Sequence, residues 1–386
     1  MYLIHPLILQ LLYCYEDIFN VQGVVYEWCR PVIVIIVTLT LSKVIYIYCK
    51  ERLQIMREKN YDLLRVVNCI MIVLLHAGAF FVSSEKNTEH VVGVVCQGMT
   101  RTAVPCFVML SGAFLLSDER WRNYKFAVKK TYEKIVVPTI LYTVFFVAFS
   151  CFTYWLGLTE ASYKKVIELT ICGYPYPHMW YMYMCIGLYL ATPVIWKIKS
   201  GGGKNLGSIV LILIAGYMIQ RSFQLIWPIK FIPFIGYFLF GNYVRQLNLE
   251  KTKNRKYIAT GSFILWMVFI TISCIGQIVE TKNIWDVLPT DPLCPIVVIA
   301  SLFCFVFFST LDLKLDTYRL AKHTESIYFI HIVVQQIIWT LGEKICPNLN
   351  VICKIGGIVC ISMVVSLLYS ICLKKLRLMI VYGKEI

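Results

Sequence analysis

The chain has 386 residues, of which 59% are hydrophobic and only 15% are charged, whereas a typical soluble domain carries about 25% charged residues. Its formal net charge is +15, but Lys and Arg stand in short runs between long apolar stretches, which argues against a nucleic-acid-binding protein. None of the 16 cysteines forms a C-x-x-C pair, so neither a zinc site nor a disulfide framework is expected, and no metal is predicted. The composition therefore predicts a membrane protein.

Ten apolar ranges after residue 60 predict membrane-spanning helices, because lipid offers no hydrogen-bond partner to a backbone that is not helical. Two further apolar stretches, about 1–15 and 31–49, precede them. The predicted fold is all-α, a polytopic transmembrane bundle with a ten-helix core and two extra N-terminal helices. The ten ranges are roughly 64–83, 102–118, 135–157, 178–196, 206–222, 229–246, 257–279, 293–311, 326–344 and 351–373.

The basic residues predict the orientation of these helices. Most of the 37 Lys and Arg residues fall into alternate loops, such as those after residues 118 and 246 and at the end of the chain. Cytoplasmic loops of membrane proteins carry such an excess of positive charge. We therefore expect both ends of the ten-helix core to lie in the cytoplasm.

The first sixty residues repeat a pattern found near the other end of the chain. Tyr2 and His5 are spaced as Tyr328 and His331 are, and a basic run follows each of the two segments. This similarity predicts that residues 1–60 are a two-helix segment resembling the tail of a second copy, ahead of a main membrane domain at residues 61–386. A chance match between short apolar strings is the alternative.

The first core helix carries the clearest pair of ionisable residues, Arg65 and His76. Eleven residues turn an α-helix by nearly three full turns, so both side chains share one face, about 16 Å apart along the axis. An arginine at the cytoplasmic edge would place the histidine about halfway into the bilayer core. Arginine matches phosphate groups, and histidine can take and return a proton near neutral pH. The alternatives are an arginine that reaches lipid head groups and a histidine bonded within the bundle.

Several further segments share their order with a known family. Because of these segments and the Arg65/His76 spacing, the chain resembles the acyltransferase 3 family of integral membrane acyltransferases over about residues 60–380. One departure is Ile332, which follows His331 where the family usually has proline. The similar segments are Arg101-Thr102-Ala103-Val104-Pro105 with Leu110-Ser111-Gly112, the basic run from Lys125 to Lys134, His178-Met179-Trp180-Tyr181, Phe234-Ile235-Gly236-Tyr237-Phe238 with Gly241, and Glu325-Ser326-Ile327-Tyr328-Phe329-Ile330-His331.

The resemblance implies an enzyme in a bacterial cytoplasmic membrane. It would move an acetyl or similar acyl group from cytosolic acetyl-CoA, or another acyl-CoA, to a hydroxyl of a cell-surface or lipid-linked carbohydrate. His76 would be the general base, with an acyl-histidine intermediate as the alternative, and Arg65 would organise the site or bind the donor phosphates. The partners implied are the lipid bilayer, the acyl-CoA and the carbohydrate acceptor, with no nucleic acid.

Other residues in these segments are weaker candidates. Lys129, Lys130 and Lys134 could meet donor phosphates, although cytoplasmic topology alone would also place them there. The candidates for substrate binding each have a plainer alternative as a flanking charge, an interfacial anchor, a helix-start carboxylate or a packing residue. They are Arg101, His178, Trp180, Tyr181, Glu325 and His331.

Two other classes of function stay open at this point. A transporter would also have many spans with few buried charges, although the core shows no half-to-half symmetry. A non-catalytic protein that handles glycans is the weaker alternative. The sequence leaves the acyl chain, the acceptor sugar and homo-oligomer formation undetermined.

Overall fold

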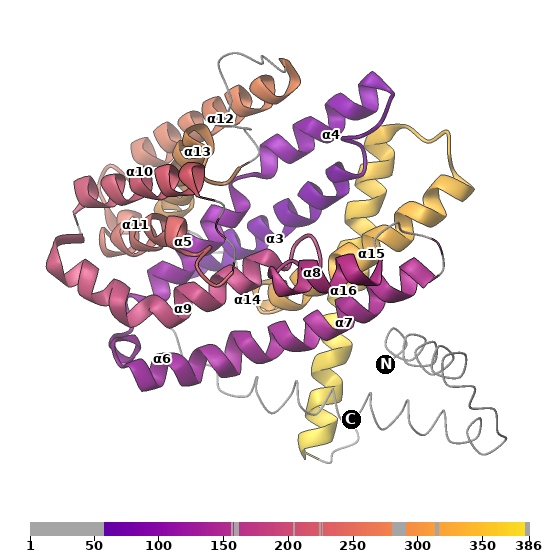
Figure 1. Cartoon of the computed structure of the whole chain (residues 1–386). Coiled ribbons are helices and arrows are strands. Elements are labelled where there is room, and N and C mark those ends of the chain that lie inside the picture. The colour runs from indigo at the N-terminus through magenta and orange to yellow at the C-terminus, as the bar shows by residue number, and fades with distance from the viewer. Residues whose placement is uncertain are drawn as a thin grey trace.

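The computed structural model describes residues 58–155, 157, 162–203, 205–223, 225, 227–279, 291–312 and 316–382. All regular elements within these ranges are helices (Figure 1), which confirms the all-α prediction. The predicted N-terminal segment 1–60 lies outside the described residues except for its last three positions. Its likeness to the end of the chain stays a prediction.

The described part of the chain forms the following principal helices. Short 3-10 or π segments lie between some of them, at Glu119–Arg122, Tyr132–Val136, Lys199–Gly203, Ile232–Phe234 and Leu249–Lys251. The helices are α3 (Lys59–Ala79), α4 (Asn87–Thr100), α5 (Ala103–Leu115), α6 (Tyr124–Thr131), α7 (Val137–Trp155), α8 (Tyr163–Ile171), α9 (Trp180–Ile198), α10 (Leu206–Ser222), α11 (Ile235–Gln246), α12 (Arg255–Val279), α13 (Pro295–Thr310), α14 (Tyr318–Ala321), α15 (Thr324–Ile345) and α16 (Val351–Tyr382).

Six helical stretches in the described part of the chain are long and apolar enough to cross a membrane, and α10 and α13 are shorter apolar helices. Each of the ten apolar ranges of the sequence contains a helix, which confirms a polytopic helical membrane protein. The number of ten crossings stays a prediction. The six stretches are Lys59–Ala79, Asn87–Leu115, Tyr124–Trp155, Trp180–Gly201, Arg255–Ile278 and Val351–Lys375.

The second stretch begins earlier than the sequence predicts, at Asn87 rather than near residue 102. The polar side chains of Glu89, His90 and Gln97 lower the hydropathy of α4. The apolar pattern of the sequence therefore shows only the second half of this stretch, which is α5. Arg101 therefore lies between α4 and α5, inside this stretch rather than at its outer end.

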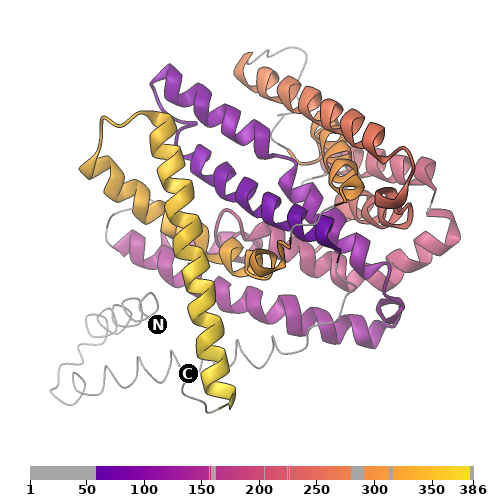
Figure 2. The same ribbon diagram turned by 180° about the vertical axis from the view of Figure 1, so that it is seen from behind.

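Helix α3 occupies the centre of the bundle. It packs against α4, α5, α13, α14, α15 and α16. Helices α10 to α13 lie on one side of it, and α15 and α16 lie on the other (Figures 1 and 2). The C-terminal part of α16 projects beyond the bundle in both views. A central α3 places Arg65 and His76 inside the molecule.

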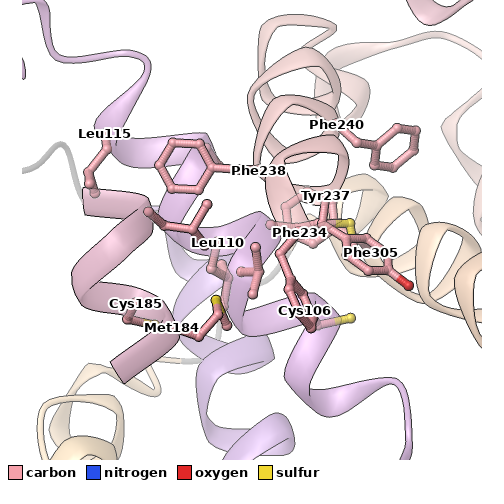
Figure 3. Packing of buried hydrophobic residues seen from close by; sticks show 14 of the residues in the cluster. Cys106, Leu110, Leu115, Met184, Cys185, Phe234, Tyr237, Phe238, Phe240 and Phe305 are labelled. Atoms are coloured by element: carbon pink, nitrogen blue, oxygen red, sulfur yellow. The ribbon is translucent and has the colours of Figure 1, made fainter. Parts of the chain in front are cut away.

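The crossing of α5 and α11 is the closest helix contact in the core. A Cβ atom added to Gly112 would lie 1.8 Å from the carbonyl oxygen of Phe238, and one added to Gly241 would lie 1.9 Å from that of Met109. Two backbones can approach this closely only where neither has a side chain. Leu110, Phe238 and their neighbours fill the space around the crossing (Figure 3).

Candidate functional site

Three histidines from three separate segments meet at the centre of the bundle. His76 is on α3, His178 is in the turn before α9, and His331 is on α15. The ring centroids of His76 and His331 are 5.3 Å apart, those of His178 and His331 are 5.5 Å apart, and those of His76 and His178 are 6.3 Å apart. The sequence marked each histidine singly but gave no sign that they form one cluster.

The hydrogen bonds of His331 determine which of its ring nitrogens carries a proton. Nδ1 lies 3.0 Å from the carbonyl oxygen of Ile327 and 2.7 Å from that of Tyr328. Carbonyl oxygens only accept, so Nδ1 donates, and Nε2 of the neutral ring is left with a lone pair. Nε2 is buried and has no hydrogen-bond partner among the described residues. His331 therefore presents a proton acceptor inside the cluster.

His178 is also buried, with 2% of its surface exposed, and neither ring nitrogen has a partner among the described residues. Leaving a buried polar group unpaired costs about 1–3 kcal/mol. Native proteins seldom carry such groups without a functional reason or an internal water. The histidine cluster thus contains hydrogen-bonding capacity that a polar ligand could use.

Two further side chains hold the cluster in place. Gln335, one turn after His331 on α15, donates from Nε2 to the carbonyl oxygen of Val73 on α3 at 2.7 Å. The hydroxyl of Tyr328 donates to the carbonyl oxygen of His178. Neither Gln335 nor Tyr328 was predicted from the sequence to be a site residue. A glutamine within an apolar span, four residues after a histidine, was the available signal for Gln335.

A cavity of about 280 Å³ lies next to the histidine cluster. Its lining comes from several segments that lie far apart in the sequence. The exposed Glu325 is one of the lining residues. Tyr328 forms a part of its wall that contacts His178 and His331, and the Tyr181 ring lies against the Tyr328 ring. The lining residues are Arg65, Phe107, Leu110, Ser111, Phe114, Leu115, Trp121, Lys134, Tyr181, Met182, Tyr189, Thr324, Glu325 and Tyr328.

Arg65 supplies positive charge to this cavity. One of its guanidinium nitrogens lies 3.2 Å from a carboxylate oxygen of Asp62, and the guanidinium carbon is 4.9 Å from the centroid of the Phe114 ring. Asp62 and Phe114 fix the direction of the arginine fork and leave it able to bind an anion in the cavity. Lys134, which also lines the cavity, adds a second cation.

The other two predicted donor-binding lysines lie elsewhere. Lys129 is exposed and lies 3.9 Å from Glu133, and the buried Lys130 lies 3.0 Å from the same carboxylate. Neither lysine lines the cavity. The lysines of this basic run therefore have different surroundings. Lys134 lines the cavity, whereas Lys129 and Lys130 lie beside Glu133.

Arg101 and Trp180 lie near the site but outside the cavity. Arg101 donates a hydrogen bond to Gln97. The Trp180 ring lies 4.9 Å from the ammonium nitrogen of Lys230, which is a cation–π contact. Burial lowers the pKa of Lys230, and the carboxylate of Asp291 partly offsets that shift. Trp180 thus packs on a protein cation, and its predicted role in substrate binding stays untested.

No group of three or more His, Cys, Asp and Glu side chains is arranged to hold a metal ion in the part of the chain that the structure describes. No curated protein and no solved structure shows significant similarity to the chain. A family comparison does give a match, to the acyltransferase domain known as acyltransferase 3, and it covers residues 58–371. This match includes all three histidines and every residue that lines the cavity. The chain therefore belongs to the acyltransferase 3 family of membrane acyltransferases.

Proposed function

We propose that this membrane acyltransferase moves an acetyl or similar short acyl group from cytosolic acyl-CoA to a hydroxyl of a cell-surface or lipid-linked carbohydrate. The observation that carries the proposal is the position of the histidine cluster beside a cavity that contains Arg65 and Lys134. The family supplies the reaction class, and the cavity supplies a place for the donor.

The charges of this cavity favour a donor that carries phosphate groups. Its phosphates would pair with Arg65 and Lys134 at the edge marked by Glu325. The arm that carries the thioester would then extend toward Tyr181 and Tyr328. About 16 Å of helix axis separates Arg65 from His76, so a long donor is needed to connect charge recognition with chemistry.

His76 would act as the general base. Its imidazole takes the proton of the acceptor hydroxyl while the hydroxyl oxygen bonds to the thioester carbonyl carbon. The carbon–sulfur bond then breaks, and the departing thiolate takes the proton back from the imidazolium. His178 would donate from a ring nitrogen to the thioester carbonyl oxygen, and the Nε2 lone pair of His331 would accept a hydrogen bond from another hydroxyl of the acceptor. An acyl-histidine at His76, formed and then passed to the hydroxyl, is the alternative course.

We further propose that the protein lies in a bacterial cytoplasmic membrane, with both ends of the ten-helix core in the cytoplasm. In this orientation the Arg65 end of the cavity faces the cytosolic donor, and the histidines lie deeper in the bilayer. The support for it is the distribution of basic residues between alternate loops.

The test compares His76→Ala with His90→Ala in purified protein supplied with radiolabelled acetyl-CoA and membranes that contain glycans. His90 is a histidine of α4 outside the cluster, and its Nδ1 contacts the carbonyl oxygen of Val82 at 2.6 Å. We expect His76→Ala to lose transfer about 100-fold or more, and His90→Ala to keep it. Unchanged transfer by folded His76→Ala protein would refute the assignment.

A further inference from the structure

Tyr328 stands between the donor cavity and the histidine cluster, and Tyr181 lies against it on the cavity side. Both rings line the cavity, and their centroids are 5.7 Å apart. On the other side, the Tyr328 ring lies 5.2 Å from the ring of His178 and 6.1 Å from that of His331. The histidines do not themselves line the cavity. An acyl group that comes from the cavity therefore meets these two rings first.

The Tyr328 ring is held on several sides. Its hydroxyl donates to the backbone carbonyl oxygen of His178, so the ring bridges α15 and the turn before α9. The neighbouring ring of Phe329 is stacked on Tyr142 of α7, with centroids 3.9 Å apart. Tyr181 is flanked by Phe107 of α5, with centroids 6.4 Å apart. A ring anchored in this way is a rigid wall rather than a mobile side chain.

We infer that Tyr181 and Tyr328 set the length of the acyl group that the enzyme accepts, with Tyr328 as the principal barrier. This inference rests on the proposed acyl-CoA donor. A short acyl group would fit on the cavity side of the rings, with its thioester carbon beside Tyr328, whose ring also contacts His178 and His331. Each further methylene would collide with a ring whose hydroxyl is fixed to the His178 backbone. A rigid apolar wall discriminates by about 10-fold or more for each such methylene.

The first experiment measures kcat/KM for acyl-CoA thioesters of increasing chain length in wild type, Tyr328→Ala and Tyr181→Ala. Wild type should lose about 10-fold for each added methylene, and both variants should flatten that decline. Tyr328→Phe keeps the ring and removes only the hydroxyl, so it should keep most of the discrimination and also show that the site still folds.

Tyr189→Ala is the matched control. Tyr189 lines the same cavity, but its hydroxyl bonds to Ser111 at 3.3 Å and its ring lies against Trp121, away from the histidines. This variant enlarges the cavity without opening the wall, so its chain-length profile should match wild type. An equal broadening by Tyr189→Ala, or an unchanged profile in Tyr328→Ala, would overturn the inference.

A binding measurement separates this inference from the proposed function. Thermal stabilisation of the purified protein by free CoA measures binding to the donor cavity alone. Stabilisation by the series of thioesters measures how the two tyrosine rings limit the length of the acyl chain. If CoA binds wild type and the penalty for longer chains disappears in Tyr328→Ala, both ideas are supported. If CoA binds but the penalty survives in that variant, only the role of the wall is refuted. If CoA does not stabilise folded wild type, the donor cavity and the wall are refuted together.

Discussion

Two arginines contact the same aromatic ring but serve different parts of the molecule. Arg65 and Arg245 have guanidinium carbons 4.9 Å and 4.6 Å from the centroid of Phe114. Arg245 also donates to the carboxylate of Glu58 at 2.6 Å and to the carbonyl oxygen of Ala113 at 2.9 Å. Only Arg65 of the two lines the cavity. One arginine therefore stabilises the fold at this point, and the other is available to a ligand.

Replacing Arg65 with lysine tests this division of roles. The lysine keeps the charge but loses the planar fork and the face-on contact with Phe114. We expect the KM for acyl-CoA to rise about 10-fold, and the effect to shrink at high salt because added ions screen the phosphates. Steady-state kinetics at two ionic strengths would measure both changes.

The control for that prediction is Arg245→Lys, which disturbs the other contact of the same ring. It should lower the melting temperature and leave the KM for acyl-CoA within about twofold of wild type. Equal effects of the two variants on KM would show that Arg65 has no special relation to the donor.

Gln335 is expected to position the histidines rather than touch the substrate. The hydrogen bond from its side-chain amide to the carbonyl oxygen of Val73 joins α15 to α3. Each of these helices carries one histidine of the cluster. In Gln335→Met the side chain keeps its length and loses the hydrogen bond. We expect kcat to fall by about 10-fold to 100-fold because small displacements of reacting groups are costly, while the KM for acyl-CoA stays unchanged. A rise in KM at constant kcat would contradict a positioning role.

At the scale of single residues, the sequence identified much of the site but not its arrangement. Arg65 and His76 share one helix, so their spacing could be calculated from helical geometry alone. His178 and His331 lie on other segments, and only tertiary packing brings them to His76. The pairing of Lys129 and Lys130 with Glu133 could also have been predicted, because side chains three and four residues apart are neighbours on a helix surface.

At the scale of helices, the α5–α11 crossing depends on two glycines that face each other's backbone. Both belong to segments that resemble the family, Leu110-Ser111-Gly112 and the segment ending in Gly241. Their contacts give these positions a structural role, namely the close packing of two helices that also support the cavity wall at Leu110 and Phe114.

The variants Gly112→Ala and Gly241→Ala should both destabilise the fold. Each added methyl group would overlap a backbone carbonyl, so the helices must separate, at a cost of about 1–3 kcal/mol or more. Gly261→Ala on α12 is the control, because nothing lies within 4 Å of a Cβ atom added there. That change should be neutral or stabilising by up to about 1 kcal/mol, because alanine favours helix.

Thermal unfolding of the three purified variants in detergent would test this prediction. Wild-type melting behaviour of Gly112→Ala or Gly241→Ala would contradict the tight crossing. A large loss in Gly261→Ala would show instead that any added methyl group is harmful in this protein.

At the scale of the whole molecule, the apolar pattern predicted an all-α membrane protein, and the structure confirms it. The ranges around α10, α13 and α15 were predicted because hydrophobicity marks a helix in lipid whatever its neighbours are. Helix α4 was missed because its polar residues, such as Glu89, His90 and Gln97, lower its hydropathy, and a hydropathy scale cannot distinguish such a helix from a loop.

Orientation can be tested with a cysteine that the chain already has. Cys346 is exposed between α15 and α16. If both ends of the core are cytoplasmic, a membrane-impermeant thiol reagent added to intact cells should label Cys346. Mass spectrometry of peptides from wild type and Cys346→Ser would assign the label, and labelling of Cys346 only after the cells are permeabilised would reverse the orientation.

The wall made by Tyr181 and Tyr328 has a consequence for what the enzyme moves through the membrane. Both rings line the cavity, so under the proposed function a coenzyme bound at Arg65 would leave by the route through which it entered. Moving its several negative charges across the hydrocarbon would be very costly. With the wall in place, only a small uncharged fragment would advance toward the far leaflet. The cell would then export acyl groups while its coenzyme pool stays in the cytosol.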